Sequence, residues 1–545
     1  MSVASVTDMP LGEGRVVSQS EERRVIFASS LGTVFEWYDF YLYATLAPFF
    51  AALFFPPGNE TAALLSAFAA YAAGFLVRPF GALVFGRLGD IVGRKYTFLV
   101  TIVFMGGSTF LVGLLPTFSA VGWLAPVLMV GLRLVQGLAL GGEYGGAATY
   151  VAEHAPRDKR GYATSWIQTT ATLGFFLSLA VIALCRTQMD AKVFADWGWR
   201  IPFLVSLILL AFSVYIRLKL NESPIFTQMK AEGKGSKSPL TDSFLRFPNN
   251  RLVLLALLGA TAGQGVVWYT GQFYALFFLT ITLKLDFLSA YTLVAISLLI
   301  GTPLFVFFGW LSDKIGRLKI IMAGCLIAAV SYFWLFGLLT HYVNPDLEAF
   351  QAKTKIMVAA DPATCNFHIF VGPWSKFSEC DRAKDALTKS GLSFSSIKGE
   401  AGKTVVVTIG DKRLEGFDAK EGLPKLAAAL KEVGYAATAD TKKVNWFMAE
   451  LILVIFLVYV TMVYGPIAAF LVELFPTNIR YTSMSLPYHI GNGWFGGMLP
   501  LLATALVAWS GDIYYGLWYP IGVSVMTLVI GMIFLKETKG VDITK

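Results

Sequence analysis

Charged side chains are scarce in this sequence. Only 15% of the 545 residues are Asp, Glu, Lys or Arg, against about 25% in typical soluble proteins. Hydrophobic residues make up 56%, and the mean hydropathy is +0.62. A chain of this composition is expected to face lipid or to pack inside a membrane bundle, which excludes an ordinary soluble protein.

Residues suited to metal or covalent chemistry are also few. The four Cys and four His are too scattered for a metal site. No Gly-x-x-x-x-Gly-Lys-Ser/Thr loop is present, which argues against an ATPase, and no catalytic constellation appears. We therefore expect no enzyme, no cofactor and no metal. The net charge of +8 fits basic cytoplasmic loops better than nucleic-acid binding.

Long apolar stretches fill most of the chain. The first follows a polar segment and lacks a small-residue cleavage site, so we expect a retained helix and not a signal peptide. A helix needs roughly 20 apolar residues to cross about 30 Å of hydrocarbon. Twelve stretches qualify: 27–54, 62–86, 96–116, 122–150, 161–185, 199–219, 251–281, 287–310, 318–341, 444–472, 485–510 and 514–536.

Loop charge predicts the orientation. The 217–251 segment is rich in Lys and Arg, whereas the 55–61 loop has one charged residue and the 116–122 loop has none. Basic loops stay in the cytoplasm, so both termini are expected inside the cell membrane, a bacterial inner membrane.

Two motifs recur along the chain. Gly86–Lys95 returns at Gly309–Lys319 with the same spacing of Gly, Leu, Asp, Gly and Arg, 223 residues later. Glu153-x-x-Pro156-x-x-x-Arg160 returns from Glu473 to Arg480, 320 residues later. Repeated motifs in the same order indicate a duplicated architecture. The growing offset indicates an insertion of roughly a hundred residues in the second half.

Residues 344–443 have the composition of a small soluble α+β domain. We expect strands at Ile356–Ala360 and Lys403–Gly410, and helices at Asp381–Ser390 and Pro424–Val433. Because the domain follows the ninth span, it is expected outside the membrane. There, Cys365 and Cys380 are expected to form a disulfide between the end of a strand and the start of a helix.

Three further motifs are Glu36-Trp37-Tyr38-Asp39-Phe40, Arg78-Pro79-Phe80-Gly81 and Arg133-x-x-Gln136-Gly137-x-x-x-Gly141-Gly142-Glu143. Together with the repeated motifs they resemble the metabolite:proton symporter branch of the major facilitator superfamily. The resemblance implies an all-α membrane protein with twelve transmembrane helices in two pseudo-symmetric six-helix bundles, and a monomer. The expected units are 1–216, the linker 217–250, 251–343, the insert 344–443 and 444–545.

Charged residues inside membrane helices are functional candidates. Glu36 and Asp39 are three positions apart on one helix face, and a buried carboxylate can exchange protons near neutral pH. Arg78 is a candidate for binding an anionic substrate, and Arg133 for substrate binding or proton coupling; the resemblance favours coupling. Alternatively, these groups pair with one another and only hold the first, second and fourth helices together.

Further candidates for the substrate site are polar or aromatic. Four lie in a glycine-rich seventh helix that is expected to bend, although aromatic residues also pack in cores and against lipid. A lone His such as His489 is more often a packing residue than a proton carrier. The candidates are Tyr38, Trp268, Tyr269, Gln272 and Tyr274, with Tyr464, Tyr488, His489 and Asn492 as weaker ones.

The repeated motifs imply a gate. By resemblance, their charges form ion pairs between helices that close the inner end of the transporter; the alternative is solvated loop charge. Leu318 replaces the Lys95 of the first motif, which puts the matching ion pair in doubt. The gating candidates are Asp90, Arg94, Glu143, Glu153, Arg160, Asp313, Arg317, Glu473 and Arg480.

The function expected from the sequence is secondary active transport by alternating access. Protons would drive uptake of a small organic anion, such as a mono-, di- or tricarboxylate, because two Arg fall in helices of the first half. A zwitterionic osmolyte such as betaine or proline is the alternative, although no long heptad tail follows Lys539. A membrane sensor with a ligand-binding outer domain is a third reading.

Overall fold

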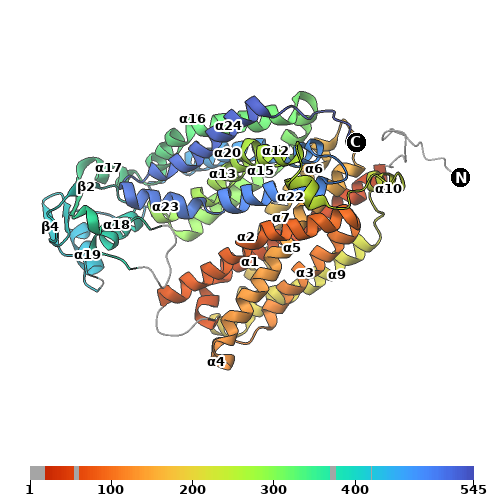
Figure 1. The fold of residues 1–545 in the computed structure, drawn as a ribbon. Helices are drawn as coiled ribbons and strands as arrows, with labels where there is room; N and C mark the ends of the chain where they lie inside the picture. Colours follow the sequence, from red (N-terminus) through yellow and green to blue (C-terminus); the bar gives the residue numbers. More distant parts are fainter. Residues whose placement is uncertain (1–18, 55–59, 369–375, 419, 545) are drawn as a thin grey trace.

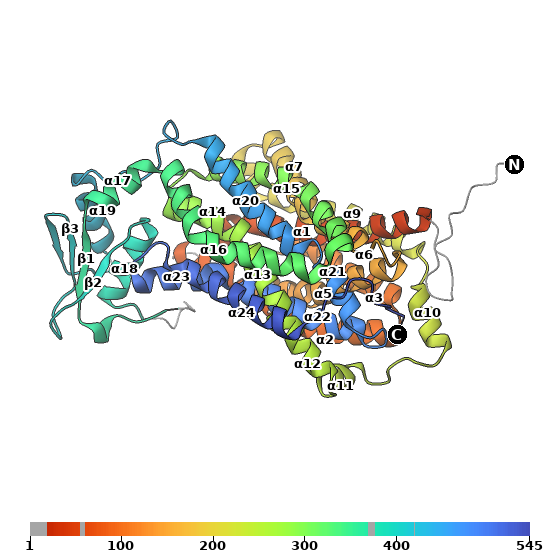
Figure 2. The same cartoon turned by 90° about the horizontal axis from the view of Figure 1, so that it is seen from above.

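Two groups of long helices lie side by side, and a small α+β unit caps one end of them (Figure 1). The computed structural model describes residues 19–54, 60–368, 376–418 and 420–544. The start of the first helix and the C-terminal residues lie at the end away from the α+β unit (Figure 2). We call this the distal end.

The first half consists of helices from the first 218 residues. Short helices connect the long ones, and the linker to the second half adds two more. The long helices are α1 (Gln19–Phe54), α2 (Glu60–Ile91), α3 (Arg94–Leu114), α5 (Leu124–His154), α6 (Arg160–Gln168) with α7 (Thr170–Gln188), and α9 (Ile201–Leu218). The short elements are α4 (Phe118–Val121), α8 (Ala191–Asp196), η1 (Gly198–Arg200), α10 (Pro224–Ala231) and α11 (Pro239–Phe244).

The second half has more irregular helices. Its first span, 249–282, alternates between α-helical and π-helical turns, which occur often at functional sites. That span comprises α12 (Asn249–Ala256), η2 (Leu257–Thr261), α13 (Ala262–Tyr269), η3 (Thr270–Tyr274), α14 (Ala275–Phe277) and η4 (Phe278–Thr282). The others are α15 (Phe287–Ile315), α16 (Arg317–Val343), α20 (Trp446–Tyr464) with α21 (Ile467–Leu474), α22 (Arg480–Ile490) with η6 (Gly491–Gly496) and α23 (Leu499–Ser510), and η7 (Tyr515–Leu517) with α24 (Trp518–Phe534).

Ten helices in the described part of the chain are long and apolar enough to cross a membrane. Helices α1 and α2 have 36 and 32 residues, which also exceeds the length required.

The charged loop predicted at Gly86–Lys95 is shorter in the structure. Helix α2 continues to Ile91 and α3 starts at Arg94, so two residues make the turn. Gly93 adopts a φ of 152°, and Gly316, at the equivalent place in the second half, adopts 118°. Residues with a Cβ rarely adopt such angles, so glycine allows the chain to reverse within this short connection.

The insert contains a four-stranded sheet and three α-helices: α17 precedes the first strand, α18 connects β1 to β2, and α19 follows β4. Strands β1 and β2 are parallel, whereas β3 runs antiparallel to both β1 and β4, in the order β2-β1-β3-β4. Its elements are α17 (Pro345–Lys353), β1 (Ile356–Ala360), η5 (Pro362–Thr364), α18 (Glu379–Lys389), β2 (Ser395–Lys398), β3 (Val406–Ile409), β4 (Lys412–Glu415) and α19 (Gly422–Glu432).

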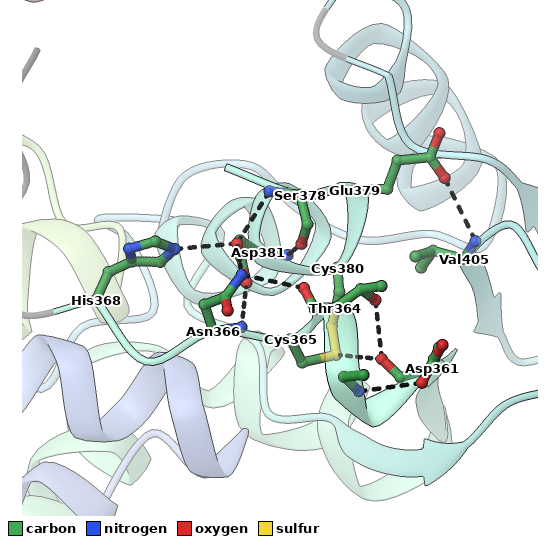
Figure 3. The surroundings of a disulfide bond; sticks show 11 residues. Asp361, Thr364, Cys365, Asn366, His368, Ser378, Glu379, Cys380, Asp381 and Val405 are labelled. Carbon is green, nitrogen blue, oxygen red and sulfur yellow. Dashed lines mark hydrogen bonds and ion pairs between the residues drawn. A yellow bond between two sulfur atoms is a disulfide. The ribbon is translucent and has the colours of Figure 1, made fainter. Parts of the chain in front are cut away.

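The expected disulfide is confirmed. Cys365 and Cys380 are bonded, with their Cα atoms 5.2 Å apart (Figure 3). Cys380 lies in the first turn of α18, where Ser378 and Asp381 form a capping box. The bond therefore fixes the segment after β1 against the start of the following helix.

The insert is attached to the second half by backbone and side-chain hydrogen bonds. The Phe394 amide donates to the Gly511 carbonyl over 2.7 Å, and the Ala439 amide donates to the Lys284 carbonyl over 3.0 Å. The Asn344 side chain donates to the Leu283 carbonyl over 2.9 Å. These contacts tie the insert to the ends of η4 and α23.

Candidate transport site and gate

A buried ion pair joins α1 to α5 in the first half. Arg133 Nη1 lies 2.9 Å from Asp39 Oδ2, and the two side chains are 5% and 4% exposed. Gln136 Nε2 donates to Asp39 Oδ1 and to Thr109 Oγ1, over 3.2 and 2.9 Å. Both oxygens of the Asp39 carboxylate are therefore occupied by donors from α5.

Arg133 has further bonding capacity. Its guanidinium lies over the Tyr43 ring, 3.7 Å from the centroid. Its Nε and Nη2 atoms are buried without a hydrogen-bond partner among the described residues. Asp39 thus uses only part of the donor set of Arg133, which leaves the other nitrogens available for an oxygen ligand.

Arg78 faces the same place from α2. A cavity of about 20 Å³ is bounded by Asp39, Arg78 and Arg133, which is space for about one water molecule. The Arg78 guanidinium lies over the Phe75 ring at 4.1 Å. Asp39, Arg78 and Arg133, three of the four charged candidates for coupling or substrate binding, therefore border one cavity. The side chain of the fourth, Glu36, lies outside the described residues.

Tyr38 is directed elsewhere. Its hydroxyl donates to the Pro202 carbonyl over 2.6 Å, and the residue is fully buried between α1 and the start of α9. In this conformation Tyr38 belongs to the packed interior of the first half and not to the Asp39 cavity.

Aromatic side chains also connect the two halves. The Trp37 ring of α1 and the Trp268 ring of α13 have centroids 5.1 Å apart. The rings of Tyr144 and Tyr488 stack at 3.7 Å with an angle of 4°. Tyr488 also shares a 2.7 Å hydrogen bond with the hydroxyl of Tyr464. Trp268 and Tyr464 therefore lie at the interface between the halves, as a central site requires.

The other candidates of the second half are distributed over its interior. Asn492 forms a reciprocal amide pair with Gln264, with distances of 2.9 and 3.0 Å. Tyr274 packs on Phe336 at 5.6 Å, within the second half. Tyr269 lies against Trp268, with ring centroids 4.8 Å apart.

Three buried polar groups in this region are incompletely satisfied. Both amide atoms of Gln272, the indole Nε1 of Trp268 and the Nε2 of His489 have no hydrogen-bond partner among the described residues. Leaving such a group unpaired costs about 1–3 kcal/mol. Groups of this kind are candidates for contacts made only in another state of the protein.

The first repeated motif binds the second half at the distal end. Asp90 accepts hydrogen bonds from the backbone amides of Tyr481 and Thr482, over 3.2 and 2.8 Å, and pairs with Arg94 at 2.7 Å. Glu153 pairs with Arg480 of the other half at 2.8 Å. The carboxylate of Asp90 thus caps the first turn of α22.

The second motif repeats this arrangement in reverse. Asp313 accepts from the amides of Gly161 and Tyr162, over 2.9 and 2.8 Å, at the first turn of α6. Arg317 pairs with Asp313 at 2.7 Å and with Glu473 at 3.1 Å. Arg160 lies 3.5 Å from Glu473 across the interface. Each half therefore caps a helix of the other with an Asp and adds a Glu–Arg pair.

Glu143 does not share in these contacts between halves. Its carboxylate pairs with Arg217 of α9 at 2.5 Å and accepts from Thr101 over 2.8 Å. All three residues belong to the first half. Glu143 thus connects helices within one bundle, whereas we expected it in the gate.

The substitution of Leu318 for Lys95 leaves the equivalent contact in place. Glu222 accepts from the Lys95 backbone amide at 3.2 Å, and Glu537 accepts from the Leu318 amide at 3.1 Å. Because the backbone supplies the donor, the contact is independent of the side chain. The Lys95 side chain itself donates to the Leu218 carbonyl over 3.1 Å and makes no ion pair among the described residues, so the ion pair put in doubt at Leu318 has no counterpart in the first motif.

The C-terminal segment also crosses the interface. Arg160 donates to the Val541 carbonyl over 2.9 Å, and Arg480 donates to the Ile543 carbonyl over 2.6 Å. Arg157 donates to the Gly540 carbonyl over 2.6 Å. Sequence reasoning missed this segment because its backbone carbonyls have no signature in a sequence. It missed Glu222 and Glu537 because their partners are backbone amides.

Comparison with known proteins identifies the family of this chain. The profile of the family described as "Sugar (and other) transporter" matches residues 25–246. The shikimate transporter of Escherichia coli (strain K12) is 37% identical over 326 residues, which cover 59% of this chain and 73% of that protein. The chain belongs to the major facilitator superfamily. It is a multi-pass membrane transporter and not an enzyme.

Other members of the superfamily agree with this assignment. The alpha-ketoglutarate permease of Escherichia coli (strain K12) is 32% identical over 335 residues, 61% of this chain and 76% of the permease. The proline/betaine transporter of Salmonella typhimurium (strain LT2) is 35% identical over 330 residues, 59% of this chain and 65% of that protein. The fold matches the proton:xylose symporter XylE with a TM-score of 0.62 at 16% identity, covering 96% of this chain and 98% of XylE.

Proposed function

We propose that this transporter couples proton movement to uptake of a small organic anion by alternating access. The observation that carries the proposal is the buried pair of Asp39 and Arg133 beside Arg78. Protonation of Asp39 removes its charge and releases Arg133, because a neutral carboxyl no longer compensates the guanidinium. Two guanidinium groups then face one cavity, and a substrate carboxylate restores the balance through bidentate hydrogen bonds.

The coupling follows from the cost of an uncompensated charge inside the membrane. With Asp39 ionised, Arg133 is paired and an added anion would repel the carboxylate. With Asp39 protonated, an empty site would leave Arg133 unpaired. Proton and anion therefore stabilise each other's binding, which is the requirement for symport. Glu36, one turn before Asp39, is proposed as a second proton carrier.

The second half supplies the rest of the proposed site. Trp268 and Gln272 are the strongest candidates, because their buried polar atoms have no partner among the described residues. Tyr269, Tyr464, His489 and Asn492 lie on the helices that surround them. Tyr274 and Tyr38 would need a different conformation to reach a substrate.

The gate at the distal end would close the cytoplasmic side. In the proposed topology, twelve spans form two six-helix bundles (1–216, and 251–343 with 444–545) in a bacterial inner membrane. The linker and both termini lie in the cytoplasm, and the insert lies outside. The protein acts as a monomer in the bilayer, with protons and a small molecule as its partners. Opening inward requires Asp90 and Asp313 to leave the amides of the opposite half.

A zwitterionic osmolyte is the second candidate substrate. Its carboxylate would use the same Arg residues, and its cationic group would lie against the rings of Trp37, Trp268 or Tyr464. The similarity to proline/betaine transporters supports this candidate as well.

Two assays in proteoliposomes test the proposed cycle: exchange of substrate measures its movement across the membrane, and accumulation of substrate measures coupling to protons. We expect Asp39→Asn, and likewise Glu36→Gln, to abolish accumulation of a labelled acid under a pH gradient while sparing some exchange. A mutant of the exposed linker, Glu232→Gln, should behave as wild type. Normal accumulation by both carboxylate variants would refute the coupling role. Absence of exchange in the wild type with any acid or betaine would favour a sensor.

A further inference from the structure

We propose that the groove between the insert and α23 binds a soluble organic anion with an apolar body, such as a medium-chain or aromatic carboxylate. The groove has a volume of about 900 Å³, within the usual range of small-molecule sites. Its walls come from α18, β2 and the segment around Cys365, and its floor is one face of α23. This site is separate from the Asp39 cavity, and the proposal does not depend on the transported substrate.

The apolar part of the ligand is inferred from exposed side chains. Four large hydrophobic residues that line the groove are 40–54% exposed. On α23 such exposure is expected of a helix that crosses a membrane, but on the insert it marks a binding surface. Two come from the insert and two from α23, so the patch exists only because the insert docks there. They are Phe367, Ile397, Leu501 and Trp509.

The charge of the ligand is inferred from the pairing of the groove's ionic groups. Asp381 accepts from the His368 side chain at 3.0 Å and from the backbone amides of Asn366 and Ser378 (Figure 3). Asp385 pairs with Lys389 at 2.7 Å. Asp385 is therefore paired with a cation, and both oxygens of Asp381 accept hydrogen bonds.

Two ammonium groups of the groove are not compensated in this way. Neither Lys384 nor Lys398 has a carboxylate within 4 Å among the described residues. Lys384 is half-buried, and burial lowers the pKa of its ammonium group more than the nearby Asp381 carboxylate raises it. A bound anion would add to the effect of Asp381. The two residues come from α18 and β2, on neighbouring elements of the sheet unit. A carboxylate between them, with its apolar body toward Trp509, satisfies both features of the groove.

The Cys365–Cys380 disulfide stabilises one wall of the groove. Cys365 lines the groove, whereas Cys380 is fully buried behind it at the start of α18. The bond thereby holds the segment that carries Phe367 and His368 against the helix that carries Lys384.

Binding of labelled octanoate to the full-length protein in nanodiscs of zwitterionic lipid tests the proposal. We expect saturable binding that falls at least tenfold in Lys384→Gln/Lys398→Gln and severalfold in Trp509→Ala. The control Lys431→Gln/Lys442→Gln removes two exposed ammonium groups of the insert outside the groove and should bind as wild type. Octanamide and octylamine, which have the same chain without the negative charge, should not compete.

Several results would overturn the proposal. Equal binding by both double variants would show that the lysines are not the anion site. Competition by octanamide as strong as that by octanoate would show a merely apolar surface. Displacement of octanoate by phosphatidylglycerol, added to the nanodiscs, would assign the groove to a membrane lipid instead. Since the variants lie outside the proposed transport site, a failure here leaves the exchange assay unchanged, and the two proposals fail separately.

Discussion

Replacing Asp90 with Asn should shift the transporter toward the state in which the distal end is open. The Asp90 carboxylate receives two backbone hydrogen bonds from the opposite half, at 3.2 and 2.8 Å, and one contact from Arg94 of its own half. A hydrogen bond to a charged group contributes about 1.5–3 kcal/mol. Asn keeps one acceptor oxygen and loses the charge, so about one such bond is lost between halves. The open state should gain about 10- to 100-fold in population relative to the closed one.

Cysteine accessibility can measure this shift. Ser485 is fully buried and faces Gly145 of the other half, so a thiol placed there is protected while the gate is closed. In protein with Ser485→Cys, and with Cys185 and Cys325 replaced by Ala, we expect Asp90→Asn to raise the rate of labelling about 10-fold or more. Asp313→Asn should act similarly because its contacts are equivalent, whereas Glu232→Gln in the exposed linker should not. An unchanged labelling rate in both Asp variants would refute the gate.

Three further predictions follow from individual contacts. Arg78→Lys should impair transport nearly as much as Arg78→Ala, since lysine lacks the planar fork; a wild-type KM for the acid in Arg78→Lys would contradict direct binding. Cys365→Ser/Cys380→Ser should lower the free energy of unfolding of the insert by about 3 kcal/mol, seen as faster limited proteolysis, and mass spectrometry of unreduced protein should find the cross-linked peptide; two free thiols in protein purified without reductant would contradict it. Burial alone would raise the pKa of Asp381, but hydrogen bonds from His368, Ser378 and Asn366 lower it below its ordinary value of 3.8. The ionised carboxylate should therefore stabilise the insert above that pH, and this contribution should be lost as the pH falls through the lowered pKa. In the Asp381→Asn variant, the rate of limited proteolysis should depend less on pH in the acid range. An unchanged pH dependence would refute the assignment.

The sequence predicted those elements that carry a strong local pattern. Strand β1 matches its expected range, and helices α18 and α19 lie within two residues of theirs. The sequence did not predict β2 and β4, the two edge strands of the sheet. None of their residues is buried, so neither strand shows the alternation of apolar and polar side chains that indicates a strand. Strand β3 is shorter than the stretch expected at Lys403–Gly410.

The candidate site was predictable in its charges but not in its pairings. Membrane-embedded Asp39, Arg78 and Arg133 stand out in an apolar chain, and the alternative that they pair with one another was foreseeable. That Asp90 caps α22, or that carbonyls of the C-terminal segment bind Arg160 and Arg480, depends on backbone groups brought together only by the tertiary fold. The stacking of the Tyr144 ring on the Tyr488 ring across the two halves also depends on the tertiary fold and could not be predicted.

Uptake driven by an imposed pH gradient tests the central claim most directly. Proteoliposomes containing the purified protein would be offered a panel of labelled mono-, di- and tricarboxylates, with proline and glycine betaine, with and without an inward proton gradient. The account predicts that at least one carboxylate accumulates above its external concentration only with the gradient, and that Asp39→Asn abolishes this accumulation. Accumulation of betaine or proline alone would assign the site to zwitterions, and gradient-independent equilibration of every compound would contradict proton coupling itself.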